Sequence, residues 1–171
     1  LGLSFSISVI LAWLTERTNM PFRNVVFVLI VASIGIPNVI LGIAWDMVLN
    51  PVNGLINVFL RSVLGLEGGG PISIFSLPGL IFVQGLSLVP ITFLLLSAAF
   101  RAIDVSMEDA AAASGASFWA LTRRVTLPLL APALLSAFVY QFVTVIESFD
   151  IPLIIGLRAG IPVLSTQIYI S

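Results

Sequence analysis

Long apolar runs with almost no charge are the feature that most restricts what this chain can fold into. Hydrophobic residues make up 59% of the 171 residues, charged residues make up only 9%, and the mean hydropathy is +1.18. A soluble domain carries about 25% charged residues, and a helix needs roughly 20 apolar residues to cross a bilayer. In lipid, backbone polar groups must be paired within the spanning structure. We therefore predict an all-α integral membrane protein, a polytopic helical bundle.

Four runs are candidates for membrane spans, at residues 1–14, 25–49, 77–100 and 127–146. The first is too short alone, and we expect it to be the tail of a helix in a fragment of a longer protein. The second contains Gly35, Pro37 and Gly42, which predict a kinked helix. The fourth has Pro128 and Pro132 near its start, where prolines are tolerated best. We predict about four transmembrane helices in a single domain over residues 1–171.

The segment 50–76, between the second and third runs, has a helical pattern of its own. Its apolar residues recur at helical spacing, and the polar residues Asn57, Arg61 and Ser62 lie on the other faces. The apolar residues are Leu55, Ile56, Phe59, Leu60, Val63 and Leu64. This pattern predicts a short interfacial helix at the outer membrane surface. The tract 68–70 is three glycines with no following Lys-Ser or Lys-Thr, so it predicts a flexible turn rather than a phosphate-binding loop.

Residue types and charge exclude several classes of function. The net charge is −1 and the seven basic residues are scattered arginines, so we expect no nucleic-acid binding. The chain has no Cys and no His, which removes disulfides, thiolate chemistry, the usual zinc sites and a histidine base. We predict no catalytic residue, no metal site and no cofactor bound by this chain.

The connection 101–126 has a pattern of caps and small residues. Ser106 followed by Asp109 predicts a capping box and a helix that starts near Met107. Four alanines continue this helix, and Gly115 suits the left-handed conformation that ends one. Ser117 then predicts the cap of a second helix, which carries Phe118, Trp119 and Leu121 and ends with Arg123 and Arg124. An ordinary helical hairpin explains each residue separately, but 26 residues with a smooth alanine face favour a surface on which another protein docks.

The arginines indicate an orientation. If the connection 101–126 is cytoplasmic, five arginines lie inside (17, 23, 101, 123 and 124) and two lie outside (61 and 158). Basic residues are retained on the cytoplasmic face, so this distribution supports that orientation.

The stretch 108–128 also resembles the coupling loop of the membrane subunits of ABC importers. The family pattern is Glu-Ala-Ala, three residues, Gly, nine residues, an aliphatic residue, one residue and Leu-Pro. Here Asp109 takes the place of the usual Glu, with Glu108 just before it, and Gly115, Val125 and Leu127-Pro128 hold the later positions. The segment 51–57 is similar to an outer loop of these permeases.

The resemblance implies a MetI-like permease of a bacterial or archaeal inner membrane, crossing it several times. It implies that a separate ATPase subunit docks on the loop 101–126 and binds the ATP, and that an extracytoplasmic substrate-binding protein delivers the substrate. A second permease half, fused or separate, would complete the path, with this chain as the first half of a fused protein. The residues implied for ATPase docking are Glu108, Asp109, Ala110, Ala111, Ala112, Gly115 and Ala116.

The residues 147–156 and 159–165 resemble iron(III)-type permeases, which are related to the polyamine and thiamine branches. Iron(III) or a related cation is therefore the expected substrate, and polyamine or thiamine is the alternative. The carboxylates of Asp46, Glu147 and Asp150 would suit a cation, although interfacial placement explains them more simply.

Polar residues within the spans are candidates for a translocation path, or else for hydrogen bonds between helices: Gln84, Tyr140, Gln141 and Thr144. A transporter driven by an ion gradient is a further alternative, but such proteins place ionisable residues in mid-membrane, and spans two to four have none near their centres. A membrane-embedded hydrolase is disfavoured because the chain has no His or Cys.

Overall fold

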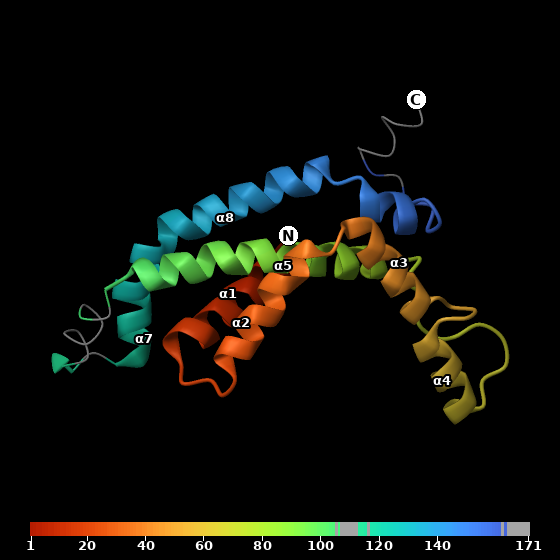
Figure 1. Cartoon of the computed structure of the whole chain (residues 1–171), viewed down its shortest axis with the longest axis horizontal. Coiled ribbons are helices and arrows are strands. Elements are labelled where there is room, and N and C mark those ends of the chain that lie inside the picture. Colours follow the sequence, from red (N-terminus) through yellow and green to blue (C-terminus); the bar gives the residue numbers. More distant parts are fainter. Residues whose placement is uncertain (105, 107–112, 116, 162, 164–171) are drawn as a thin grey trace. The chain divides into compact units, whose positions relative to one another are not determined.

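A computed structural model shows the described chain as a set of helices (Figure 1). It describes residues 1–104, 106, 113–115, 117–161 and 163, without the side chain of Phe118. The described residues contain no strand, in agreement with the predicted all-α fold. The elements are α1 (Gly2–Arg17), α2 (Arg23–Ala32), η1 (Ser33–Gly35), α3 (Asn38–Leu49), α4 (Leu55–Leu64), α5 (Leu77–Ala102), α7 (Phe118–Leu121), η2 (Thr122–Thr126), α8 (Leu127–Glu147) and η3 (Pro152–Gly156).

Two described helices are long and apolar enough to cross a membrane. They are α5, with 26 residues, and the continuous helix Trp119–Glu147, with 29 residues. A third candidate is the pair Arg23–Gly35 and Asn38–Leu49 if the two count as one broken span. The helix α1 has 16 residues and matches the partial span predicted at the start of the chain. These lengths and compositions confirm a helical membrane protein.

The second predicted span is broken rather than kinked. The helix α2 ends in the 3₁₀ turn η1, and α3 begins after Pro37, which leaves a bend of 108°. Proline disfavours a helical conformation in the residue before it, and Gly35 adds further freedom at the break. Because of this break, neither piece is long enough to cross alone.

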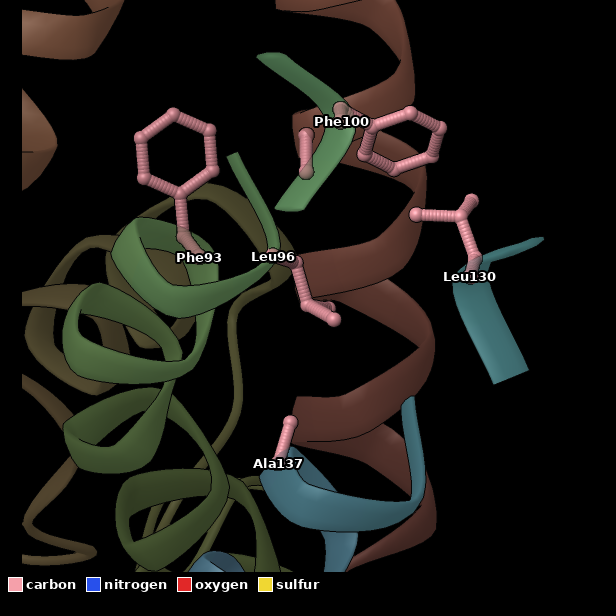
Figure 2. Close-up of a cluster of buried hydrophobic side chains, with 6 residues drawn as sticks. Phe93, Leu96, Phe100, Leu130 and Ala137 are labelled. Carbon is pink, nitrogen blue, oxygen red and sulfur yellow. The ribbon is translucent and has the colours of Figure 1, made fainter. Parts of the chain in front are cut away.

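The described chain forms two compact units, each with its own core. The first consists of Leu1–Ser33 and Val89–Phe142, and its core combines Phe93, Leu96 and Phe100 from α5 with Leu130 and Ala137 from α8 and Ala12 from α1. Figure 2 shows these α5 and α8 side chains around α1. The buried face of α1 carries only small side chains, namely Ser4, Ser8, Ala12 and Thr15. Small residues at such spacing let helix backbones approach closely in a membrane.

The second unit consists of Ile34–Leu88 and Val143–Ser171. Its core contains Ile74, Leu80 and Val83 together with Ile151 and Ile155 from the segment around η3. Trp45 and Phe82 add an edge-to-face ring contact with centroids 4.9 Å apart. This core therefore joins the segment 50–76 to residues far along the chain.

The helix α4 confirms the predicted short helix in the segment 50–76, but the part played by Asn57 differs from the prediction. Leu55, Phe59 and Val63 are 62–70% exposed, while Asn57 is fully buried. The Asn57 Nδ2 donates to the carbonyls of Leu49, Asn50 and Ile72 at 3.3, 2.9 and 2.6 Å, and its Oδ1 accepts from the Ile72 amide at 3.1 Å. The sequence pattern placed Asn57 on a polar face, but its side chain instead holds the segment 50–76 together through buried hydrogen bonds.

Candidate functional site

The connection 101–126 is the first candidate site, and the structure describes its two ends. At the start, Asp104 lies just beyond α5, and its carboxylate accepts a hydrogen bond from the Ser106 amide at 2.9 Å. This bond holds the pKa of Asp104 below its ordinary value. Residues 107–112 lie outside the described residues, and with them the predicted capping box and the docking residues Glu108, Asp109, Ala110, Ala111 and Ala112. Ala116 lies outside them as well.

Gly115 has the left-handed conformation that its position predicts, with φ of +81°. A β-carbon added there would meet nothing within 4 Å, so the requirement for glycine comes from the backbone angle and not from crowding. The predicted cap at Ser117 is confirmed, since its Oγ accepts from the Ala120 amide at 3.3 Å. The two ends of the predicted turn are therefore as the sequence indicates.

The second helix of the connection does not end at Arg123 and Arg124, contrary to the prediction. Both arginines lie in the π-helical turn η2, where the Leu127 amide bonds to the Thr122 carbonyl, and the helix then continues as α8. Pro128 has no amide to donate to a carbonyl in the preceding turn, which explains the irregular geometry immediately before it. The connection is thus continuous with a helix long enough to cross the membrane.

Arg17 and Arg101, which indicate the orientation of the chain, also fasten the start of this connection to α1. Arg17 Nη2 donates to the Phe100 carbonyl at 3.0 Å and to the Ile103 carbonyl at 3.4 Å, which occupies backbone acceptors at the end of α5. Arg101 forms an ion pair with Glu16 at 2.8 Å, and Ser97 donates to the same carboxylate oxygen. The sequence showed only the charges of Arg101 and Glu16, because the contact joins residues 85 positions apart.

The predicted path residue Gln141 lies in a buried polar network of the first unit. Its Oε1 accepts from Ser4 Oγ at 3.0 Å, and its Nε2 donates to Thr92 Oγ1 at 2.7 Å. All three side chains are at most 1% exposed. The network joins α1, α5 and α8 by hydrogen bonds between helices, which is one of the two roles that the sequence left open.

The other predicted path residues are partly buried. In the second unit, Gln84 Oε1 accepts from Ser148 Oγ at 3.0 Å. Tyr140 and Thr144 have intermediate exposure and lie one on each side of the boundary between the two units along α8. Their assignment to a translocation path stays a prediction.

The acidic residues considered for cation binding do not form a cluster. Asp46 is neutralised locally: its carboxylate accepts from Arg158 at 3.2 Å and from Asn50 Nδ2 at 2.9 Å. Glu147 is exposed at the end of α8, and Asp150 is half-buried. Among the residues that the structure describes, no group of three or more His, Cys, Asp or Glu side chains could hold a metal ion.

Comparison with known proteins gives the family and several relatives. Residues 5–171 match the family described as binding-protein-dependent transport system inner membrane component. The chain is similar to the trehalose/maltose transport system permease protein MalF of Thermococcus litoralis, with 31% identity over 88% of the chain and 49% of that protein. It is similar to the ferric transport system permease protein FbpB of Actinobacillus pleuropneumoniae, with 29% identity over 68% of the chain and 16% of that protein. The molybdenum transport system permease protein ModB of Haemophilus influenzae shows 27% identity over 85% of the chain and 61% of that protein. The chain thus spans less than two thirds of the length of each of these relatives.

Proposed function

Because the chain belongs to the family of inner membrane components of binding-protein-dependent transport systems, we propose that it forms part of the transmembrane path of an importer driven by a separate ATP-binding-cassette ATPase. The relatives are transport permeases and not enzymes. One observation carries the coupling part of the proposal: a connection with the family's spacing lies between two helices long enough to cross the membrane, and its glycine has the left-handed conformation.

The proposed mechanism places the ATPase on the small-residue face that begins near Glu108 and ends at Ala116. Closure of the ATPase on nucleotide would push this face, and the movement would reach the bundle through α5, α8 and α1. The contacts of Arg17 and Glu16 support this route because they fasten the end of α1 to the end of α5 where the connection begins. Packed helices move between discrete arrangements rather than deforming continuously, so a fastened group of helices moves together.

Orientation is part of the same proposal. With the connection 101–126 in the cytoplasm, five of the seven arginines lie inside. This assignment requires the broken pair Arg23–Gly35 and Asn38–Leu49 to cross the membrane, since α5 must start outside. Residues 1–171 contain no Cys, so Asn19→Cys and Asn53→Cys each introduce one thiol into this part of the protein. An impermeant thiol reagent applied to intact cells should label only the second variant.

The test of coupling is Gly115→Val, with Gly65→Val as a matched control. Both glycines have positive φ, +81° and +63°, and a β-carbon at either meets nothing within 4 Å. The left-handed conformation costs an ordinary residue about 1–2 kcal/mol, a shift of roughly 5- to 30-fold in the local equilibrium. Binding-protein-dependent uptake should fall by about that factor in Gly115→Val, while ATP hydrolysis and membrane insertion persist.

The control separates coupling from general strain. Gly65 ends α4 on the proposed outer side, so Gly65→Val should leave the ratio of uptake to ATP hydrolysis unchanged. Equal uncoupling by both variants, or unchanged uptake in Gly115→Val, would contradict the assignment of the connection as the ATPase-docking loop.

For the substrate we propose iron(III) or a related cation, on the similarity at residues 147–156 and on the ferric relative. The other relatives are named for trehalose/maltose and for molybdenum, so the experiment compares all three classes. Vesicles containing the complete transporter, its ATPase and its binding protein should take up ferric iron in preference to molybdate or maltose. Faster uptake of either competitor would reject the cation proposal and leave the importer proposal intact.

A further inference from the structure

An open cavity of about 490 Å³ lies in the first unit where α1, α2 and α5 have their arginine-bearing ends. Its lining is Thr15, Glu16, Arg23, Asn24, Phe27, Val28 and Arg101. Ligand cavities in proteins usually measure about 300–1,000 Å³, so this one is large enough for a small headgroup. Its lining shares the Arg101–Glu16 pair with the contacts that fasten α1 to α5, and it is separate from the polar network around Gln141 and from the proposed path residues.

The charges around the cavity favour an anion. Arg101 donates through Nε and Nη2 to Glu16, at 3.0 and 2.8 Å, and its guanidinium lies 4.8 Å from the centroid of the Phe27 ring. The side chain of Arg101 is nevertheless 58% exposed, whereas that of Glu16 is 12% exposed. The acid is therefore largely covered, and the cation faces the open space.

Arg23 adds a second positive charge. It is exposed, and in the described part of the chain its guanidinium makes no hydrogen bond or ion pair, although its charge also acts on the Glu16 carboxylate. With Glu16 offset by Arg101, the lining has a net charge of one positive unit, from Arg23. Guanidinium groups bind phosphate through paired hydrogen bonds, which makes a phosphate a suitable ligand for this pair.

The start of α2 adds neutral donors on the same side. Arg23 and Asn24 are its first two residues, and no side chain caps this end. The amides of a first helical turn have no intrahelical acceptor and favour an anion. The residue before them, Phe22, has φ of +60° and is 79% exposed. The free amides of this turn therefore add to the attraction that Arg23 and Arg101 exert on an anion.

An apolar wall distinguishes a lipid from a free anion. Phe27 and Val28 line the cavity, and the same helix continues with exposed apolar residues: Val25, Val28 and Leu29 are 53–64% exposed. A free phosphate would use only the charged end of this surface. A phospholipid would use both, with its phosphate at the arginines and an acyl chain along α2.

We propose that this cavity binds the phosphate headgroup of an acidic phospholipid from the cytoplasmic leaflet, through Arg23 and Arg101. The inference rests on the proposed orientation, which puts these arginines at the cytoplasmic surface. Basic pockets between membrane helices on this side are suited to acidic lipid headgroups. The bound lipid would hold the ends of α1, α2 and α5 together next to the coupling connection.

The test uses the complete purified transporter in neutral detergent, titrated with phosphatidylglycerol, phosphatidylcholine or inorganic phosphate. Bound lipid is counted by native mass spectrometry and the unfolding temperature is followed in parallel. Arg23→Gln should weaken phosphatidylglycerol binding about fivefold, because a basic residue at an acidic membrane surface contributes about 1 kcal/mol. Arg23→Lys keeps the charge and should retain most of the affinity. Arg124→Gln removes the same charge from an exposed position outside the cavity and should bind phosphatidylglycerol like the unmodified protein.

The outcomes separate this proposal from its alternatives. Equal stabilisation by inorganic phosphate would show a site for free anions and overturn the lipid proposal. Binding that is unchanged in Arg23→Gln, or reduced equally in Arg124→Gln, would overturn it too. Failure of phosphatidylglycerol to bind the unmodified transporter would overturn it as well, and cross-linking of Arg23 to another protein segment would then show that protein covers the cavity. Labelling of Asn19→Cys from outside would reject the proposed orientation, whereas loss of lipid selectivity with correct labelling would reject only the lipid site.

Discussion

Replacing Asn57 by Asp tests how the segment 50–76 is held. The substitution keeps the shape of the side chain but replaces the amide that donates to three carbonyls with a carboxyl oxygen. The amide has two hydrogens to share among the three carbonyls. Each hydrogen bond contributes about 0.5–1.5 kcal/mol net, so the loss is about 2 kcal/mol, and repulsion between the new oxygen and the three carbonyls adds to it. The segment should open about thirtyfold more often or more, since 1.4 kcal/mol corresponds to about tenfold.

Limited proteolysis can measure this opening directly. The chain has no Lys, so Arg61 is the trypsin site within the segment, and its guanidinium is bonded to the Gly68 and Val52 carbonyls. When opening and closing are fast compared with cleavage, the cleavage rate follows the population of the open form. Cleavage after Arg61 should therefore accelerate about thirtyfold or more in Asn57→Asp at neutral pH. Asn53→Asp, an exposed control in the same segment, should not change it. Equal cleavage rates in Asn57→Asp and the unmodified protein would refute the claim that the hydrogen bonds of Asn57 hold the segment 50–76 together.

Two further predictions concern buried and exposed polar groups. Gln141→Leu should leave Ser4 and Thr92 without their shared partner. Because interhelical hydrogen bonds in membranes average about 0.6 kcal/mol each, the unfolding free energy, measured in detergent against the unmodified protein, should fall by about 1 kcal/mol. An unaltered stability in Gln141→Leu would contradict this network. The pKa of Asp104 is lower in the folded protein than in the unfolded chain. Its bond to the Ser106 amide therefore stabilises the turn at pH values above the ordinary aspartate pKa. This stabilisation is lost as the pH falls through the lower pKa of the folded protein. Hydrogen exchange at the Ser106 amide should accordingly be slower in the unmodified protein than in Asp104→Ala at neutral pH, and identical exchange would count against the bond.

The helices that could be predicted from the sequence are those determined by the length of an apolar run or by the spacing of apolar residues. The third run was expected at residues 77–100 and the helix α5 covers Leu77–Ala102; the fourth was expected at 127–146 and α8 covers Leu127–Glu147. The helix α4 follows from the spacing of its apolar residues. Gly115 and Ser117 were predictable because a left-handed angle and a side-chain cap each require particular residue types.

The features that were not predictable depend on contacts between distant residues. The burial of Asn57 requires the return of the chain at Ile72, fifteen residues later, and no local pattern encodes that approach. The contact of Arg101 with Glu16 spans 85 residues, so the sequence showed only its charge. The break at Gly35–Pro37 was anticipated as a kink, but the extent of a bend depends on the neighbours that satisfy the freed backbone groups.

The hydrogen bond between Ser4 and Gln141 also sets an order for biogenesis. The two residues are 137 positions apart, so α1 is synthesised long before the amide that fixes it. Because lipid tails are as apolar as the side chains, hydrogen bonds and close packing decide how membrane helices associate. The contacts of Arg17 and Glu16 with the end of α5 can form first, since α5 precedes α8 in the chain. The bond between Ser4 and Gln141 forms only when α8 inserts, so this later step completes the register of the first unit.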